Sequence, residues 1–416
     1  MGKPPDGLPR QIALAFKRES MLDYTCVMSF GTTTQRLILS AMALAFIFSI
    51  GPASRAALPF PPAPSGGKTQ LALSEPLTVR WQYDSDSTVN LTPATDGERI
   101  YLPLAGGTLV SLRSMDGQLF WRTEIGGELS ASPVADERGV YIASETIGVR
   151  SDAPRALGAL RLLGSEGGVT RWMRTLPMPL RGVLAMNETT LFGGASDGRV
   201  YAVIKKSGEI AWIMQHSAPF SSQPVLSGKR LYIGSDDGNL FALDQTTGKT
   251  IWRYRTRGAV RGRPAVLNGI IYFGSEDGYV YALEEETGRL RWRKRTGAGV
   301  QAVVAAGSGI LVASLDNFVY FLSTHRGAQV WKRQLPGRLA AQPLVVVDGA
   351  LFTPLSGDAG VVLDTKDGRQ INTLPIGEDN NTSAAPILAG DLVFLTTRHG
   401  LVAFSRPPVA SRPRTP

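Results

Sequence analysis

The sequence predicts an all-β protein, an eight-bladed β-propeller of four-stranded antiparallel blades. Three observations predict this fold: a repeat of about 40 residues, a glycine four positions before six of the seven tryptophans, and short apolar runs joined by Asn-Gly or Asp-Gly. Such a period with four strands in each unit is typical of propellers. The tryptophans that mark the repeat are Trp81, Trp121, Trp172, Trp212, Trp252, Trp292 and Trp331.

Residues 248–292 show the repeat most clearly. Three apolar runs, 264–267, 270–275 and 279–283, are separated by Asn268-Gly269 and Asp277-Gly278, and a fourth run carries Trp292. Asn-Gly and Asp-Gly between β-branched and aromatic runs are strong hairpin signals, because the turn needs positive φ angles. We therefore expect each unit to be one four-stranded sheet.

The two ends of the repeat complement each other. The strand around Trp81 has no three-stranded run before it, and residues 386–404 provide three strands with no tryptophan strand after them. We expect the N-terminal strand to complete the last sheet and close the ring, which leaves no blade with a bare edge. Gly368 predicts an eighth tryptophan at position 372, but the residue there is Asn372, so we expect the ring to be loosest at this point.

The repeat also sets the predicted domain boundaries. We expect an N-terminal extension with a signal peptide at 1–56, a Pro/Gly-rich linker at 57–75, the propeller at 76–406 and a disordered tail at 407–416. Residues 37–50 are apolar or small, follow Arg36 and are short for a membrane span, as in a signal peptide. An uncleaved anchor is the alternative, and translation could start at Met1, Met21 or Met28. Both readings predict export to the periplasm or cell envelope.

The net charge and the cysteine content restrict the classes of function that the chain can have. The net charge is +9, and cations cluster at 249–263 and 289–295, where Arg291, Arg293 and Arg295 share one strand face. Such an edge attracts anionic lipid, acidic proteins or polyanions; the alternative is a solvated edge that prevents aggregation. Nucleic acid is disfavoured by the predicted export and by the lack of aromatic residues placed to stack on bases among these charges. Cys26 is the only cysteine. The second repeat unit is longer than the others, and its extra residues near 145–158 predict a projecting loop.

Residues 234–254 and 274–294 resemble the repeat of pyrroloquinoline-quinone-type propellers, which include quinoprotein dehydrogenases and the BamB outer-membrane assembly factors. For a dehydrogenase, the resemblance implies a quinone between a tryptophan and a cysteine disulfide, with a bound calcium ion. Every tryptophan here belongs to the repeat, no cysteine pair exists, and His216, His325 and His399 are scattered. We therefore expect no catalytic residue, no cofactor and no metal.

The BamB resemblance extends to one loop. Residues 177–183, PMPLRGV, are similar to the Leu/Arg-Gly loop with which BamB contacts the central barrel-assembly protein. The resemblance implies that Leu180 is an apolar contact and that Arg181 pairs with a carboxylate of the partner. The acidic residues that this family has on the next blade are missing from 215–223, and the lipid-bearing cysteine is absent.

These observations predict a monomeric, non-catalytic scaffold that binds a protein partner in the cell envelope, with the outer-membrane barrel-assembly machinery as the candidate partner. The alternative is a periplasmic quinoprotein-like dehydrogenase or a propeller that binds a small anion in its channel. We expect the channel to be lined by the residues that precede the inner-strand prolines or the equivalent positions, which are Thr92, Ser132, Val183, Gln223, Arg263, Val303, Gln342 and Ala385.

Overall fold

The computed structural model describes residues 71–148, 155–378, 380 and 382–407. All of them lie in the second of two compact units, which runs from Pro59 to Pro416. The predicted signal peptide, most of the linker and the tail from residue 408 lie outside the described residues. The part of the chain that is described contains no helix long and apolar enough to cross a membrane.

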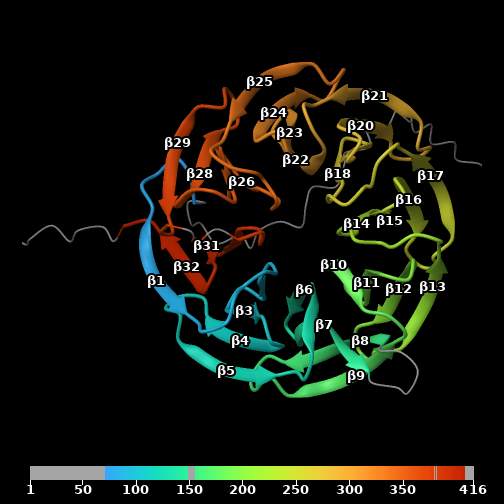
Figure 1. Ribbon diagram of the computed structural model, residues 1–416, viewed down its shortest axis with the longest axis vertical. Helices are drawn as coiled ribbons and strands as arrows, with labels where there is room; N and C mark the ends of the chain where they lie inside the picture. The colour runs from blue at the N-terminus through green and yellow to red at the C-terminus, as the bar shows by residue number, and fades with distance from the viewer. Residues whose placement is uncertain (1–70, 149–154, 379, 381, 408–416) are drawn as a thin grey trace, which may run out of the picture. The chain divides into compact units, whose positions relative to one another are not determined.

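The described residues form strands that repeat in groups of four around a ring (Figure 1). In each group the first strand lies nearest the ring axis and the fourth lies on the circumference. The first strands are β2 (Ala94–Thr95), β6 (Glu128–Asp136), β10 (Leu180–Met186), β14 (Val225–Ser227), β18 (Ala265–Leu267), β22 (Val300–Ala306), β26 (Leu344–Val346) and β30 (Ile387–Ala389). The second strands are β3 (Arg99–Leu104), β7 (Gly139–Gly148), β11 (Thr190–Ala195), β15 (Arg230–Gly234), β19 (Ile270–Gly274), β23 (Gly309–Ser314), β27 (Gly349–Phe352) and β31 (Leu392–Thr397).

The outer half of each group completes the sheet. The third strands are β4 (Thr108–Arg113), β8 (Arg155–Gly164), β12 (Arg199–Ile204), β16 (Asn239–Asp244), β20 (Tyr279–Glu284), β24 (Phe318–Ser323), β28 (Ala359–Asp364) and β32 (Gly400–Ser405). The fourth strands are β5 (Leu119–Glu124), β9 (Thr170–Leu176), β13 (Ile210–Gln215), β17 (Thr250–Arg255), β21 (Leu290–Arg295), β25 (Gln329–Gln334), β29 (Gln370–Pro375) and β1 (Thr78–Asp84). The turn residues adopt the expected positive φ angles, for example 52° at Asn268 and 72° at Gly269.

Hydrogen bonding divides the described strands into seven sheets, six with four strands and one with eight. The eight-stranded sheet consists of two antiparallel groups, β6–β9 and β10–β13, which are joined by one parallel pairing of Val183 with Ser132. Dividing that sheet at this pairing gives eight groups of four strands. The all-β propeller fold that the sequence predicts is confirmed.

The N-terminal strand closes the ring, as predicted. Strand β1 pairs with β32, so that the last sheet has the order β1-β32-β31-β30. Leu71 and Leu73, which the sequence analysis placed in the linker, are buried in a core cluster with Leu374 and Phe404. Residues 71–77 lie outside the strands, so no strand pattern in the sequence marked their leucines as part of the core.

Seven of the eight contacts between neighbouring blades share one arrangement, which we call the tryptophan joint. The indole of each repeat tryptophan lies against the positive-φ glycine of the next blade, where a Cβ would come within 2.7 Å of the ring. Its Nε1 donates a hydrogen bond of 2.7–3.1 Å to a carbonyl three residues before that glycine. The joints pair Trp81 with Gly117, Trp121 with Gly168, Trp172 with Gly208, Trp212 with Gly248, Trp252 with Gly288, Trp292 with Gly327 and Trp331 with Gly368.

The eighth contact, which we call the closing joint, has Asn372 in place of tryptophan and Leu77 in place of glycine. The Asn372 Nδ2 atom donates hydrogen bonds to the carbonyls of Leu73 at 3.0 Å and Glu75 at 2.8 Å. Glu75 also forms an ion pair with Arg406, which follows β32. Both described ends of the chain therefore meet at this joint.

Candidate functional site

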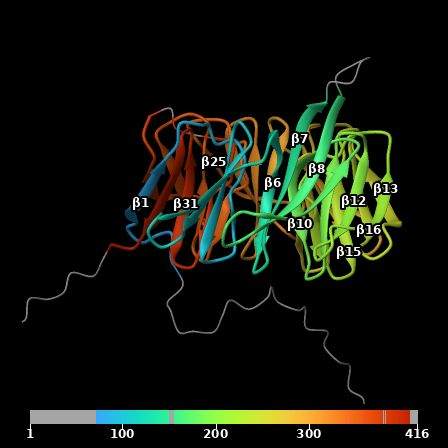
Figure 2. The ribbon, with the colours of Figure 1, turned by 90° about the horizontal axis from the view of Figure 1, so that it is seen from below.

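The most distinctive surface is the face on which each fourth strand connects to the first strand of the next blade, which we call the connector face. The turn between second and third strands lies on the same face, since neighbouring strands are antiparallel. One such turn is extended: β7 and β8 pair from Gly139↔Gly164 as far as Gly148↔Arg155. Figure 2 shows this hairpin standing out from the ring.

The extended hairpin rises beyond the blade that carries it. Strand β6 accompanies β7 only as far as Glu145, and β9 accompanies β8 only as far as Gly158. The last three residue pairs, Thr146↔Leu157 to Gly148↔Arg155, therefore have no other strand of the described residues beside them. The sequence predicted a projecting loop at 145–158, but the described part of this insertion continues the two strands.

Arg181 lies at the base of this hairpin. Its Nη1 and Nη2 atoms donate hydrogen bonds of 3.2 and 2.6 Å to the two carboxylate oxygens of Glu145. The ion pair joins the start of β10 to the point where the extended hairpin leaves its blade. The Arg181 side chain remains 37% exposed, so its charge is available at the surface.

Leu180 is placed differently from Arg181. Its side chain is 2% exposed and belongs to a core cluster with Tyr141 and Leu184. It occupies space that Gly193 leaves open, since a Cβ there would lie 3.0 Å from Leu180. The structure thus gives Leu180 a packing role, and only Arg181 of this pair faces solvent.

A second charged group lies on the connector face of the neighbouring blades. The Arg261 Nε atom is 3.1 Å from Asp236 Oδ1, and its Nη1 atom contacts Glu276. Desolvation would lower the pKa of Arg261, but the hydrogen bonds and charges of Asp236 and Glu276 raise it. This cluster was not predicted, because its members are far apart in the sequence and look like ordinary turn residues.

His216 has a partner that the sequence did not reveal. Its Nε2 atom is 2.9 Å from Asp237 Oδ2, and its ring packs against Phe241 with a centroid distance of 4.9 Å. Burial alone would raise the pKa of Asp237, but hydrogen bonds from Ser235, Asn239 and His216 outweigh it and lower the pKa. Ser235 bonds to Asp237 and not to His216, so this group lacks the nucleophile–base contact of a hydrolase.

The predicted axial residues lie where blades meet near the ring centre. The Ala385 amide donates to Thr92 Oγ1 at 2.9 Å, and the Thr92 amide donates to Ser132 Oγ at 3.1 Å. Arg263 is exposed, yet the protein around it lowers its pKa by desolvation. The axial positions therefore combine bonds between blades with a single cation.

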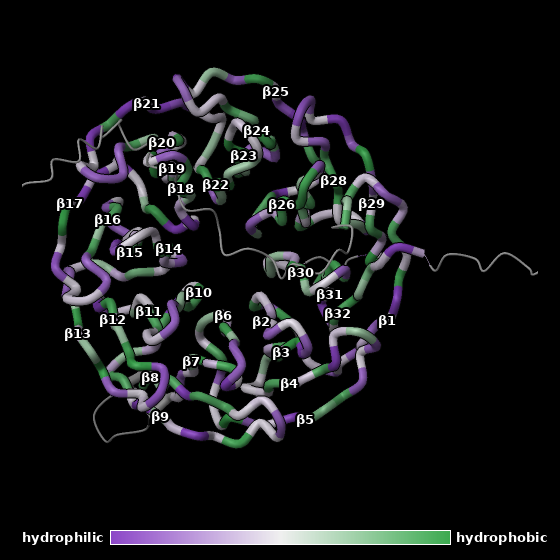
Figure 3. Tube along the Cα trace, turned by 180° about the vertical axis from the view of Figure 1, so that it is seen from behind, coloured by the Kyte–Doolittle hydropathy of each residue, from purple (hydrophilic) through white to green (hydrophobic). Residues whose placement is uncertain are grey.

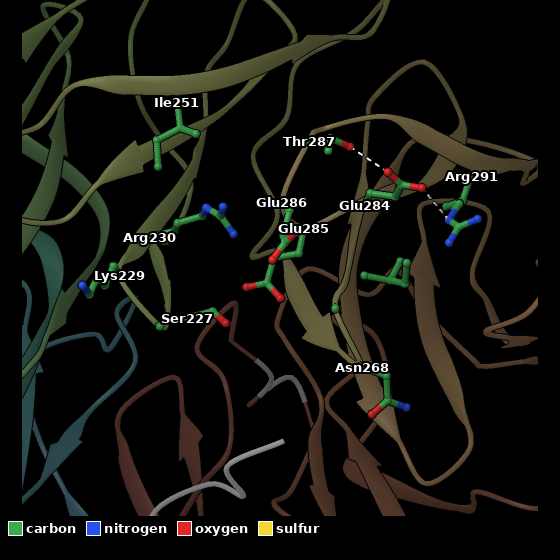
Figure 4. Close-up of a pocket in the computed structure, with 13 residues that line it drawn as sticks. Ser227, Lys229, Arg230, Ile251, Asn268, Glu284, Glu285, Glu286, Thr287 and Arg291 are labelled. Atoms are coloured by element: carbon green, nitrogen blue, oxygen red, sulfur yellow. Dashed lines mark hydrogen bonds and ion pairs between the residues drawn. The ribbon is translucent and has the colours of Figure 1, made fainter. Parts of the chain in front are cut away.

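A groove of about 720 Å³ opens on the opposite face, between the blades of β14–β17 and β18–β21 (Figure 4). Lys229 and Arg230 lie on one side of it, and Glu284, Glu285 and Glu286 lie on the other. Hydrogen bonds from Arg289 and then Thr287 lower the pKa of Glu284. The opposite charges balance within the groove, and the Thr287 hydroxyl donates a hydrogen bond of 2.8 Å to Glu284 Oε2.

A dehydrogenase-type site would need ligands for a calcium ion and a tryptophan floor for the quinone. Within the described residues, no three His, Cys, Asp or Glu side chains are grouped to hold a metal ion. All seven tryptophans pack in joints between blades and so do not form the floor of a quinone site.

The predicted basic residues of β21 all reach solvent. Arg291, Arg293 and Arg295 are exposed, whereas Trp292 between them is partly buried. Arg291 Nε is 3.2 Å from Glu284 Oε1, and the Arg293 guanidinium lies 5.0 Å from the centre of the Tyr279 ring. Along β21 these three exposed arginines alternate with the less exposed Trp292 and Lys294.

Residues 68–152, 156–263, 196–303 and 256–408 match the family described as outer membrane protein assembly factor BamB. The chain belongs to this family. It is 27% identical over 119 residues to outer membrane protein assembly factor BamB of Shewanella oneidensis, a match that covers 27% of each chain. The match thus spans about a quarter of the length of that curated relative.

Solved structures show the same fold. The crystal structure of BamB from Moraxella catarrhalis has a TM-score of 0.66 and 15% identity, and the likeness covers 81% of this chain and 99% of that one. Quinohemoprotein alcohol dehydrogenase from Comamonas testosteroni has a TM-score of 0.65 and 11% identity, with 82% and 78% covered. At these identities the likeness describes the fold alone, since one propeller fold carries different functions.

Proposed function

We propose that this chain is an exported, non-catalytic scaffold that binds a protein partner in the cell envelope through its connector face. The observation that carries the proposal is the Arg181–Glu145 ion pair at the base of the extended hairpin. Membership of a family described as an outer-membrane assembly factor supports the same function. The partner we propose is the central protein of the outer-membrane barrel-assembly machinery.

Arg181 has the chemistry that such a contact needs. Its planar guanidinium already binds one carboxylate with two nitrogens, and the same geometry suits a carboxylate of a partner. Because the pair is partly exposed, its net contribution to folding is small, and Glu145 can be exchanged for a partner group. Arginine is enriched in protein interfaces for these reasons.

The extended hairpin offers a second contact beside Arg181. Its last three residue pairs have free edges, and Leu157 is exposed at the first of them. A two-stranded ribbon without neighbours has little stability of its own in water. Contact with a partner would bury this edge and add stability to the hairpin.

The proposal is tested by measuring binding of the purified chain to the purified periplasmic part of the central barrel-assembly protein from the same organism. Arg181→Glu should weaken binding tenfold or more. Arg113→Glu is the matched control, because Arg113 is also in an ion pair and is 39% exposed, but lies at the end of β4 on the opposite face. Equal binding by both variants would contradict the role of the connector face.

The alternative function is a quinoprotein-like dehydrogenase or a small-anion-binding propeller, and the lone axial cation Arg263 is the observation that favours anion binding. Adding pyrroloquinoline quinone and calcium to the same preparation, while absorbance and dye-linked alcohol oxidation are recorded, distinguishes these functions. The scaffold proposal predicts no stoichiometric uptake of the quinone. Uptake with oxidation would favour the enzyme.

A further inference from the structure

Three neighbouring outer strands carry a continuous basic surface, which we call the basic rim. Strands β17, β21 and β25 contain eight Lys and Arg and no Asp or Glu. The other five outer strands together contain four Arg, one Asp and one Glu. Figure 3 shows β21 as strongly hydrophilic. The basic rim consists of Arg253, Arg255, Arg291, Arg293, Lys294, Arg295, Lys332 and Arg333.

Most of this charge is not neutralised by the protein. Among the described ion pairs, Arg291 is the single member of the basic rim that has a carboxylate partner, Glu284. Lys332 lies over the Phe318 ring at 3.6 Å, and Arg333 donates to the carbonyl of Gly368. These contacts hold the long side chains at the surface but leave their positive charges in place.

Exposed aliphatic side chains accompany the cations. Ile251, Leu290 and Val330 are 45%, 39% and 57% exposed, and each lies at the first or second position of its strand. The cations follow along the same strands. The basic rim is therefore amphipathic, with aliphatic side chains toward the face opposite the connector face and cations toward the connector face.

This pattern favours a lipid bilayer over an acidic protein. A bilayer interface accepts aliphatic side chains at the acyl boundary and cations at the phosphates. Its anionic headgroups repeat over a flat surface, so that residues on three successive blades can bind without a fixed register.

We propose that the basic rim binds the propeller edge-on to a bilayer of anionic phospholipids. Its strands run between the two faces of the ring, so the connector face then looks along the membrane surface. Arg181 and the extended hairpin stay accessible in that orientation. The proposal thus adds a second binding surface and does not depend on the identity of the protein partner.

The proposal predicts a charge-dependent affinity. Each Lys or Arg near an anionic membrane strengthens binding by about fivefold, and salt weakens the attraction. Removing three cations from the basic rim should therefore weaken binding to anionic vesicles by about 100-fold. Raising the salt concentration should produce a parallel loss for the unmodified chain.

The experiment measures sedimentation of the full chain with vesicles of phosphatidylglycerol and phosphatidylethanolamine, beside vesicles of phosphatidylcholine. The test variant is Arg253→Gln, Arg293→Gln and Arg295→Gln together. The matched control is Arg80→Gln, Arg122→Gln and Arg171→Gln, which removes three exposed charges from other outer strands. The apolar segment 37–50 is common to all chains, so its contribution to binding cancels in the comparison.

The expected result is an approximately 100-fold loss for the test variant and a loss of about twofold or less for the control, with thermal unfolding unchanged in both. A further variant, Ile251→Ser with Leu290→Ser and Val330→Ser, should bind about tenfold less without a change in salt dependence. Equal losses in test and control, or an equal effect of the test substitutions on binding to both vesicle types, would overturn the proposal. So would binding of an acidic polypeptide such as polyglutamate with no binding of anionic vesicles.

Discussion

The seven tryptophan joints and the closing joint connect equivalent blades in two different ways. In a tryptophan joint, an indole covers a glycine in the turn between the third and fourth strands of the next blade. These two strands follow each other directly in the chain. At the closing joint the turn is interrupted, because the third strand β32 comes from the C-terminal end and the fourth strand β1 comes from the N-terminal end. The comparison shows that two differences, asparagine in place of tryptophan and leucine in place of glycine, accompany a joint whose third and fourth strands come from opposite ends of the chain.

The two substitutions have a common physical cause. A glycine with positive φ and no Cβ lets the indole lie directly on the turn. Asn372 is smaller than tryptophan, and Leu71, Leu73 and Leu77 are buried in a core cluster against which the preceding residue, Ile371, packs. Its amide reaches the carbonyls of Leu73 and Glu75, whereas an indole would reach one carbonyl. The closing joint therefore replaces aromatic packing with aliphatic packing and two hydrogen bonds.

The largest predicted effect is at a tryptophan joint. Trp212 is 9% exposed and bonds to the carbonyl of Gln245 at 2.9 Å. Trp212→Ala should lower the free energy of unfolding by about 3–5 kcal/mol, because it removes a large buried ring and leaves a cavity. Urea unfolding followed by tryptophan fluorescence and circular dichroism measures this loss. A change below about 1 kcal/mol would show that the joint contributes little.

The closing joint should respond strongly to loss of an aliphatic side chain. Leu73 is fully buried among residues of β27–β29, β31 and β32. Leu73→Ala should cost about 2–4 kcal/mol in the same unfolding experiment. Leu157→Ala, at an exposed position of the extended hairpin, is the control and should change stability little. Equal effects would mean that residues 71–77 do not take part in the ring.

The glycine of a tryptophan joint should tolerate no side chain. At Gly248, φ is 70° and a Cβ would lie 2.5 Å from the Trp212 ring. Gly248→Ala should therefore cost about 1–3 kcal/mol through overpacking and backbone strain. Gly228→Ala is the matched control, since Gly228 also has positive φ but nothing lies within 4 Å of its Cβ. An equally large loss of stability in Gly228→Ala would show that the effect comes from backbone strain at positive φ and not from contact with the indole.

The smallest predicted effect is at Asn372. Asn372→Ala removes two hydrogen bonds to carbonyls of the N-terminal segment and should cost about 1–2 kcal/mol. Asn372→Trp should not stabilise the chain, because Leu77 occupies the position at which the other joints have glycine. Stabilisation by this tryptophan would contradict the assignment of Leu77 to that position.

The sequence predicted the propeller and its closure because both depend on local signals: Asn-Gly and Asp-Gly turns, tryptophan spacing and the incomplete first and last units. It did not predict the packing of Leu71 and Leu73, which contact residues about 300 positions away. Nor did it predict the Arg181–Glu145 and Arg261–Asp236–Glu276 groups. Such contacts depend on which turns the ring brings together. The identity of a turn residue does not indicate which distant residue it contacts.

The central claim is that the closing joint resists local opening as well as the tryptophan joints do. Amide hydrogen exchange of β29 and β17 in the native chain tests this claim most directly. Both are outer strands, but β29 contains Asn372 and β17 contains Trp252. The sequence alone predicts faster exchange for β29, whereas the contacts of Asn372 and residues 71–77 predict protection within about tenfold of β17. Exchange of β29 about 100-fold or more faster than that of β17 would contradict this account.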